Sequence, residues 1–461
     1  MNKIYIKSIL VALLLATSFV SRSQIINTFA GNGFTHGLRD SGGFSGDGGP
    51  ANAAELFNPT GVAVDSPGTI YIADVNNQRL RIVNTSGTIQ TFAGNGYAYA
   101  GSGGFSGDGG PATAAELNQP QAVAISASGN VYIADWGNNR IRMVNTSGVI
   151  STFAGTGIPA YNGDGIQATD ANIFVPDDIA LDAKGNIYFS DAGNNRIRMV
   201  NTSGIISTFA GTGVGGPFVD GVQATAANIN PSGVSLDYFG NVYITELGGS
   251  CVRKVNSTGI INTIAGVGIP GYFGDGGPAT DAELKYPSRV TVDVHGNVYI
   301  ADGANQRIRI VNTSGIINSL AGDGYTYGGY SGDGGAATAT ELNYPIGVAL
   351  DASGNLYIGD EQNNRIRRVT GISLGIKNIP SSSNEINIYP SPTTGIFTIT
   401  GLLKGQIIEL YNYTGQKLSA AISDKNTIQF DISNYANGIY LVRILNKDGS
   451  VFTTKKVVKM E

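Results

Sequence analysis

The chain has 461 residues but only one cysteine, Cys251, and only two histidines, His36 and His295. A single thiol cannot form an intramolecular disulfide, so packing has to stabilise the fold. We interpret Cys251 as a small core residue, because a cysteine among apolar neighbours packs more often than it reacts. His295 falls in a glycine turn. The sequence therefore predicts no catalytic residue and no metal ligand, and no Ser/His/Asp set can be assembled.

Charged residues are also scarce, at 14% of the chain against about 25% in an average soluble domain. The net charge of −5 argues against a nucleic-acid partner. The one long apolar run spans residues 9–20, with Lys3 and Lys7 before it and small polar residues after it. This order is typical of a secretory signal peptide cleaved near Ser23. No other run approaches the length of a membrane span, so we expect no transmembrane segment in the mature chain.

Glycine is abundant, with 66 residues, because the sequence repeats and each repeat has the same turns. The units align on an opening proline and recur every 55 to 61 residues, at Pro59, Pro120, Pro176, Pro231, Pro287 and Pro345. Each unit shows four short β-patterns, of which the second carries a tyrosine and the third reads like "RIRMV". Four strands in a unit of this period predict a β-propeller blade.

The order of the strands predicts how the ring closes. The first three strands occur six times and end near Thr370, whereas the first copy of the fourth strand, "IINTFAG" (25–31), precedes everything else. We therefore predict an all-β fold: a six-bladed β-propeller of four-stranded antiparallel blades, closed by the N-terminal strand. The segment "GISLGI" (371–376) is an alternative closing strand.

The stretch "ADWGNNRIRMV" (134–144), with Asp135, Asn138, Arg140 and Ile141, resembles the NHL repeat. The resemblance covers about residues 25–370, although Asn or Gln stands where the eponymous histidine would be. Membership of this family implies a six-bladed propeller and a binding function more often than an enzymatic one.

An aspartate at the end of the second strand and an arginine at the start of the third recur in five units. We predict that the aspartate and the arginine pair with each other and stabilise the blades. The alternative is that these residues form a polar ring that contacts ligand. The pairs are Asp74/Arg79, Asp135/Arg140, Asp191/Arg196, Asp302/Arg307 and Asp360/Arg365. The fourth unit has Glu246 and Cys251 at these positions, which suggested that the two positions change together.

A second repeated element contains "GDG" or a relative of it in the segment before each opening proline. Its aspartate recurs six times, as Asp47, Asp108, Asp164, Asp220, Asp275 and Asp333. It could hold a cation or present amides to an anion, but an aspartate that stabilises its own glycine turn is the commoner role. Both repeated elements are expected on one face of the disc, which has long loops, whereas the opposite face has only tight turns. Because function usually resides on loops, this looped face is the predicted functional face.

Departures from the repeat mark a candidate ligand site. The positions after each opening proline are expected at the mouth of the central channel, where Asp177, Asp178 and Arg289 stand out. We predict that these three and Glu246 bind ligand, and repeat drift is the alternative. We expect the substitutions Asp178→Ala and Arg289→Ala to abolish ligand binding and to leave the melting temperature almost unchanged. No cofactor is predicted, although Ca²⁺ or another divalent cation in the channel stays open.

The repeat stops after Thr370. A Ser-rich linker (371–385) leads to alternating strands, expected to form a small β-sandwich over 386–461. The residues Tyr389, Pro390, Pro392, Thr394 and Gly395, the "YNYTGQ" turn, "GIY" at 438–440 and a Lys-rich last strand resemble the C-terminal sorting domain of the Bacteroidetes type IX secretion system. That resemblance implies contact with the secretion machinery through residues 386–461 and passage through the periplasm and across the outer membrane.

The sequence thus predicts a signal peptide (1–23), a propeller (24–370), a linker (371–385) and a sorting domain (386–461). We expect a secreted or surface-displayed module that binds an extracellular protein or glycan. A lactonase- or lyase-type enzyme with a divalent cation in its channel is the alternative.

Overall fold

The structure is a computed structural model that describes residues 24–35, 42–98, 103–372, 386–412, 416–445, 447 and 451–460. The chain divides into two compact units between Leu374 and Gly375. The predicted signal peptide (1–23), His36 and most of the alternative closing segment lie outside the described residues.

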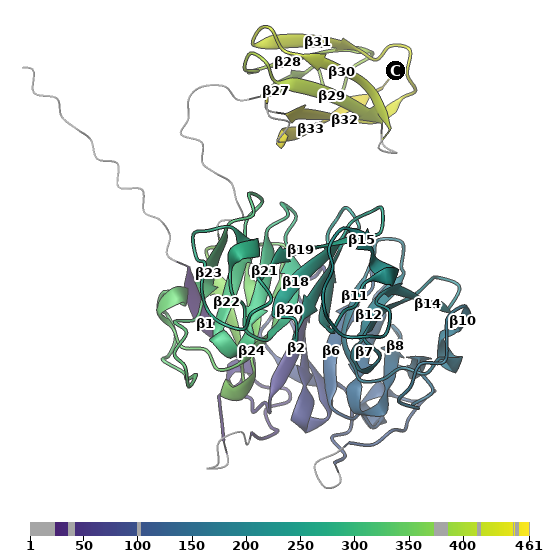
Figure 1. The fold of residues 1–461 in the computed structure, drawn as a ribbon, viewed down its shortest axis with the longest axis vertical. Coiled ribbons are helices and arrows are strands. Elements are labelled where there is room, and N and C mark those ends of the chain that lie inside the picture. The colour runs from purple at the N-terminus through teal and green to yellow at the C-terminus, as the bar shows by residue number, and fades with distance from the viewer. Residues whose placement is uncertain are drawn as a thin grey trace, which may run out of the picture. The chain divides into compact units, whose positions relative to one another are not determined.

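The first unit consists of six antiparallel sheets that form the blades (Figure 1). Blades one to three contain β2 (Pro59–Val64), β3 (Ile70–Asp74), β4 (Arg79–Val83) and β5 (Ile89–Ala93); β6 (Pro120–Ile125), β7 (Val131–Asp135), β8 (Arg140–Val144) and β9 (Ile150–Ala154); β11 (Pro176–Leu181), β12 (Ile187–Asp191), β13 (Arg196–Val200) and β14 (Ile205–Ala210). Blades four to six contain β16 (Pro231–Leu236), β17 (Val242–Glu246), β18 (Cys251–Val255) and β19 (Ile260–Ala265); β20 (Pro287–Val292), β21 (Val298–Asp302), β22 (Arg307–Val311) and β23 (Ile317–Ala321); β24 (Pro345–Leu350), β25 (Leu356–Asp360), β26 (Arg365–Thr370) and β1 (Ile25–Ala30).

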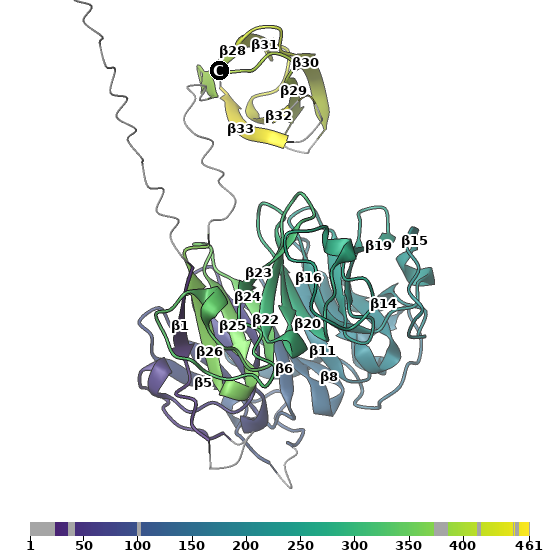
Figure 2. The same cartoon turned by 60° about the vertical axis from the view of Figure 1, so that its left-hand side comes forward.

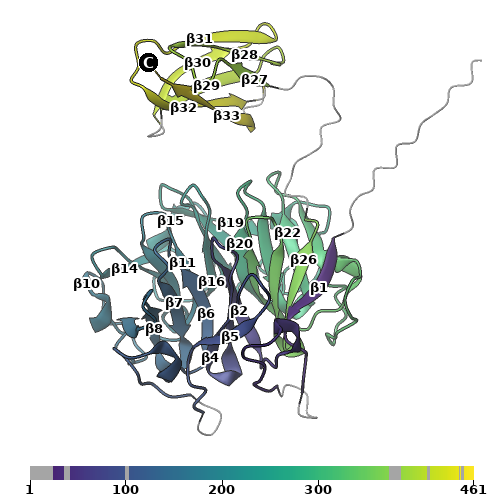
Figure 3. The ribbon, with the colours of Figure 1, turned by 180° about the vertical axis from the view of Figure 1, so that it is seen from behind.

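The innermost strands bring the six blades together around one axis. They contact one another in the order β2, β6, β11, β16, β20 and β24, and β24 contacts β2 again. The N-terminal strand β1 pairs with β26 from Ile25↔Thr370 to Ala30↔Ile366 and so supplies the outer strand of blade six (Figures 2 and 3). The prediction of a six-bladed propeller whose sixth blade is completed by the N-terminal strand is confirmed.

Packing between blades explains the recurring tyrosine of the second strand. Each apolar cluster spans two neighbouring blades; one of them joins Tyr188 and Ile197 of blade three to Ile244 of blade four. In four blades the tyrosine ring meets a phenylalanine of the same blade's fourth strand edge-on, as Tyr188 meets Phe209 at 5.1 Å between ring centroids. Because every blade shares its core with its neighbours, the ring depends on all six.

The segment before each blade covers that blade's outer edge. In blades three and four it adds the short strands β10 (Ile166–Gln167) and β15 (Val222–Gln223), and in the other four blades a single bridge, such as Pro50↔Thr88. Pairing there protects strand edges that would otherwise invite association. These segments contain the short 3-10 turns η1 (Ala51–Ala53), η3 (Ala112–Ala114), η5 (Ala168–Asp170), η7 (Ala224–Ala226), η8 (Ala279–Asp281) and η10 (Ala337–Ala339).

A second set of 3-10 turns follows the second strand of five blades: η2 (Val75–Asn77), η4 (Trp136–Asn138), η6 (Ala192–Asn194), η9 (Gly303–Asn305) and η11 (Glu361–Asn363). Each ends on an Asn or Gln with left-handed backbone, such as Asn139 at φ 52°. Asn tolerates this conformation better than most side chains do. This is the position of the eponymous histidine. The side chain at this position reaches the next blade. In blade two, Oδ1 of Asn139 accepts a hydrogen bond from the backbone amide of Val175 at 2.9 Å.

The second unit is a small β-sandwich, as predicted. Its sheets have the orders β27-β28-β31 and β30-β29-β32-β33. The strands are β27 (Asn387–Tyr389), β28 (Ile396–Thr400), β29 (Ile407–Asn412), β30 (Lys417–Ile422), β31 (Thr427–Asp431), β32 (Gly438–Leu445) and β33 (Val451–Lys459). Phe397 and Phe430 stack in a core of its own. Within the described part of the chain, no helix is long and apolar enough to cross a membrane.

We expect deletion of residues 25–30 to lower the melting temperature of the chain by at least 10 °C. Blade six then loses its outer strand, and Ile26, which is fully buried, leaves the core. Differential scanning calorimetry of the intact and shortened chains measures this. An unchanged melting temperature would mean that another segment closes blade six.

Candidate functional site

Each blade contains a fully buried arginine that the sequence interpretation did not single out. In blade one, Arg81 pairs through Nη1 with Asp74 at 3.3 Å and through Nη2 with Asp47 at 2.7 Å. The Asp47 carboxylate also accepts the hydroxyl of Thr91 at 2.7 Å, and the Phe44 ring packs on the guanidinium. The equivalent arginines are Arg142, Arg198, Arg253, Arg309 and Arg367. Each therefore joins the two repeated acidic elements.

The predicted pairing of Asp74 with Arg79 is wrong in its choice of arginine, and so are the equivalent pairs with Arg140, Arg196, Arg307 and Arg365. Asp74 and Arg79 are opposite in register, but the ion-pair partner of Asp74 is Arg81, two residues further along β4. Arg79 instead donates to the carbonyl oxygens of Asn77 and, at 2.8 Å, Asn95. It thereby holds the start of the loop that follows β5.

In blade four both repeat positions differ, but the two substitutions have independent effects. Glu246 keeps the buried role of the aspartates, because it pairs with Arg253 at 3.3 Å and accepts the amide of Asn230 at 2.7 Å. Glu246 is fully buried, so the structure places it in the blade and not beside the other candidate ligand residues. Cys251 replaces only the loop-holding arginine. Burial raises the pKa of its thiol to about 12, which keeps it protonated at neutral pH.

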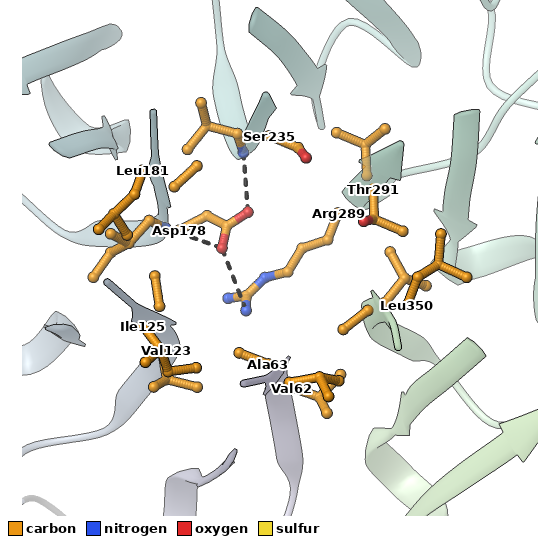
Figure 4. Close-up of a pocket in the computed structure, with 18 residues that line it drawn as sticks. Val62, Ala63, Val123, Ile125, Asp178, Leu181, Ser235, Arg289, Thr291 and Leu350 are labelled. Carbon is orange, nitrogen blue, oxygen red and sulfur yellow. Dashed lines mark hydrogen bonds and ion pairs between the residues drawn. The ribbon is translucent and has the colours of Figure 1, made fainter. Parts of the chain in front are cut away.

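The other three candidate residues do come together, in the central channel. At the second position after the opening proline, the innermost strands have Gly61, Ala122, Asp178, Gly233, Arg289 and Gly347. A Cβ atom on Gly61 would lie 2.7 Å from Nη1 of Arg289, so small residues leave the space that the guanidinium occupies. Figure 4 shows Arg289 of blade five reaching across the channel to Asp178 of blade three.

The Arg289 guanidinium is shared by two carboxylates. Nη1 of Arg289 lies 3.7 Å from the Asp178 carboxylate, and Nη2 donates to the carbonyl oxygen of Asp177 at 2.8 Å and its carboxylate at 3.3 Å. Asp178 also accepts the amides of Ile179 and Val234, both at 3.0 Å. Burial nevertheless raises the pKa of Asp178 to about 6. Asp178 and Arg289 are 8% and 5% exposed, so the expectation that their removal leaves stability unchanged is inconsistent with this structure.

This ion pair forms the floor of a cavity of about 270 Å³. The walls are formed by residues further along the inner strands, including Val62, Val123, Leu181 and Leu350 (Figure 4). The strand ends nearest the tight turns, such as Val64 and Leu181, are partly exposed, whereas Thr60 and Gly61 at the other end are buried. The channel is therefore constricted towards the looped face and wider towards the tight-turn face.

The channel carboxylates are the residues that could contact a cation. Arg289 already occupies the position between Asp177 and Asp178. Among the residues that the structure describes, no group of three His, Cys, Asp or Glu side chains could hold a metal ion.

A second feature that sequence reasoning missed lies at the looped face. Every loop after a fourth strand begins Gly-X-Gly, and the next residue is apolar and exposed by 40 to 59%. We call these six residues the crown: Phe34, Tyr97, Ile158, Val214, Ile269 and Tyr325. The signal was an apolar residue at one loop position in every repeat, where a polar residue would be expected.

The crown residues are held in place by the polar groups of the blades. In blade two, Arg140 donates to the carbonyl oxygen of Thr156 at 2.6 Å, and the Thr156 hydroxyl accepts the amide of the crown residue Ile158. Equivalent contacts hold the loops of blades one, three, five and six. Blade four has Cys251 for the arginine and Val267 for the threonine, so its loop, which carries Ile269, lacks both side-chain anchors.

Comparison with known families agrees with this architecture. The profile of the teneurin NHL domain matches residues 21–105, 101–161, 156–214 and 270–329, more than half of the chain, and that of the NHL repeat matches 342–369. The profile of the secretion system C-terminal sorting domain matches residues 387–460. The chain belongs to the NHL-repeat propeller family of the teneurin NHL domain. Its type IX sorting domain indicates export across the outer membrane through contact with that secretion machinery.

The curated relatives are much longer proteins. Human teneurin-4 is 28% identical over 486 residues, which cover 94% of this chain but 16% of teneurin-4. The chloroplastic protein SUPPRESSOR OF QUENCHING 1 of Arabidopsis thaliana is 28% identical over 272 residues, covering 55% of this chain and 25% of that protein.

Solved structures share the propeller fold. An auxiliary nutrient binding protein from Bacteroides ovatus has a TM-score of 0.54 and 16% identity, covering 75% of this chain and 76% of that one. A protein of unknown function from Bacteroides thetaiotaomicron has a TM-score of 0.54 and 18% identity over the same shares. At these identities the likeness is one of fold.

We expect Arg198→Met to lower the free energy of unfolding by about 3 kcal/mol or more, because it leaves Asp191 charged and buried without its cation. Arg196→Met, two residues away, should cost about 1 kcal/mol, because it loses hydrogen bonds to carbonyl oxygens and the contact with the Tyr161 ring but leaves no buried carboxylate without its cation. Urea unfolding of both variants measures the difference. Equal losses would contradict the division of roles between the two arginines.

A double-mutant cycle tests the channel ion pair. Arg289→Met alone should destabilise the chain by about 3 kcal/mol, since Asp178 then lacks its partner. Adding Asp178→Asn should restore at least about 1 kcal/mol of the additive loss. Melting temperatures and urea midpoints of the four proteins supply the coupling. If the two losses simply add, the pair contributes no interaction.

Proposed function

We propose that this chain is an exported β-propeller that binds an extracellular protein through the crown on its looped face. The observation that carries the proposal is the recurrence of one exposed apolar residue in all six loops. Single exposed apolar side chains are ordinary on soluble proteins. Six at one position of a repeat are a shared feature of the looped face and not a random scatter, which favours a role in association.

The anchoring of the crown supports this proposal. A loop that is already held in place loses little conformational entropy when a partner binds, which favours affinity. Five of the six loops have the arginine and the side-chain turn described above, and blade four does not. The same loop also exposes Phe273 by 69%. A partner would therefore meet five loops held by side chains and one held through its backbone, by bridges such as Pro270↔Leu284.

Export is consistent with such a role. The sorting-domain match supports action outside the outer membrane, where the propeller would meet other secreted or surface proteins. A structurally similar propeller from Bacteroides ovatus is described as an auxiliary nutrient binding protein, which is compatible with a binding role for this fold.

A lactonase- or lyase-type enzyme is the second candidate. The observation in its favour is the channel cavity of about 270 Å³ with Asp178 at its floor. Arg289 stands where a divalent cation would have to bind, so a cation would first have to displace it. We therefore place binding before catalysis. Cation-dependent turnover of a lactone by the purified chain would reverse that order.

The test is a triple variant, Ile158→Ser/Val214→Ser/Ile269→Ser, of the immobilised chain. Proteins retained from the outer-membrane and extracellular fractions of the producing cells are identified, and the strongest is purified and titrated. We expect its dissociation constant to rise at least tenfold in the triple variant, about 1.4 kcal/mol. The melting temperature should stay the same, because these side chains are more than half exposed.

Val294→Ser is the matched control, because Val294 is 78% exposed on the tight-turn face. It should bind like the unmodified chain. An unchanged dissociation constant in the triple variant would contradict the crown as the binding surface.

A further inference from the structure

The tight-turn face has one strong departure from the repeat. The turn between the first and second strands has the pattern Asp-X-X-Gly in five blades and Ser-X-X-Gly in blade two, and in blade four its two central residues are Tyr238 and Phe239. In the other blades these positions hold Ser66/Pro67, Ala127/Ser128, Ala183/Lys184, Val294/His295 and Ala352/Ser353. None of those residues is Phe, Tyr or Trp, and the same Gly amide to Asp or Ser carbonyl hydrogen bond closes each turn. The tight turn therefore does not itself require an aromatic pair.

The two rings are the most exposed aromatic pair on the described surface. Tyr238 is 90% exposed and Phe239 is 76% exposed. Their ring centroids lie 5.8 Å apart with an edge-to-face arrangement, so each ring restricts the other. The turn beneath them is firm, because the Asp237 carboxylate accepts the amides of Phe239 and Asn241, both at 2.9 Å. Two apolar rings are thus held in water by a rigid support.

A cleft of about 530 Å³ lies beside these rings, between the turns of blades three and four. Its lining includes Lys184 and Asp182 from blade three, and Tyr238, Asp237 and Ser257 from blade four. The corresponding cleft between blades five and six, where Ala352 of blade six stands at the place of Tyr238, measures about 250 Å³. The larger volume falls within the range of small-ligand sites.

The polar groups around the cleft are balanced in charge. Asp182 and Asp237 contribute two carboxylates, and Lys184 contributes one ammonium group. A second ammonium group, of Lys254, lies 4.0 Å from the Asp237 carboxylate. The cleft is thus lined by hydroxyl and ammonium groups and by aromatic rings, so it offers both hydrogen bonds and a stacking surface without a net charge.

We propose that this cleft binds a neutral oligosaccharide. The flat face of a pyranose ring presents C–H groups with partial positive charge, which pack favourably on the electron-rich faces of aromatic rings. Its hydroxyl groups need donors and acceptors of the kind that Lys184 and Ser257 supply. The site is separate from the crown, which lies on the opposite face, so the two can be tested independently.

Affinity electrophoresis of the purified full chain tests this site. The gels contain a neutral polysaccharide (glucomannan, xyloglucan, arabinoxylan, laminarin or amylopectin) or the acidic polymer polygalacturonic acid. We expect at least one neutral polymer to retard the chain. In Tyr238→Ala/Phe239→Ala the association constant from the retardation should fall at least tenfold, with an unchanged melting temperature because both side chains are exposed.

Two further variants make the result specific. Tyr238→Phe keeps the ring and should retain most of the binding, whereas Val294→Ala/His295→Ala alters the equivalent turn of blade five and should bind normally. Three results would overturn the proposal: no retardation by any neutral polymer, retardation by polygalacturonic acid alone, or equal retardation of the Tyr238/Phe239 double variant. The crown variant should be retarded like the unmodified chain, so failure here leaves the protein-binding proposal unaffected.

Discussion

The structure of each blade depends on a buried arginine shared by two carboxylates. Arg81 and its five equivalents are fully buried, one partner is a buried Asp or Glu, and the other is the partly exposed Asp of the preceding loop. Two charges cannot stay in the interior without each other, so breaking either pair is costly. The arginine therefore fixes the loop on the blade. An aromatic residue of the same loop, such as Phe44, then packs over the guanidinium.

This arrangement explains why a chain with few charged residues repeats the same ones so faithfully. The outer edge of every blade is covered by the segment that the arginine holds, which leaves the looped face with defined loop tips. The neighbouring arginine, Arg79 in blade one, holds the next loop by donating a hydrogen bond to the carbonyl oxygen of Asn95. Blade four keeps the buried arginine, Arg253, but lacks the arginine that holds the next loop, because Cys251 replaces it. Architecture and loop anchoring are thus separable within one repeat.

The departures from the repeat have different physical consequences. Asp178 and Arg289 form an ion pair across the channel and constrict it, so the carboxylate of blade three has its counter-ion in blade five. The rings of Tyr238 and Phe239 are not covered by other side chains and stay in contact with water. The crown residues are a third case, because they are apolar in every blade and exposed in every blade. Association through the two faces accounts for the exposed apolar residues better than chemistry in the channel does.

The sequence by itself determined the number of blades, the four-strand pattern and the C-terminal sandwich, and it favoured the N-terminal strand over residues 371–376 as the closing strand. These features follow from local periodicity and turn residues, which repeat in the chain and need no knowledge of distant contacts. Only the tertiary structure decided which arginine pairs with Asp74. Arg79 and Arg81 are two residues apart on one strand, and the choice depends on Asp47, which the chain brings in from more than thirty residues away. The pairing of Asp178 with Arg289 was likewise hidden, because the two residues are 111 positions apart and meet only when six blades surround one axis.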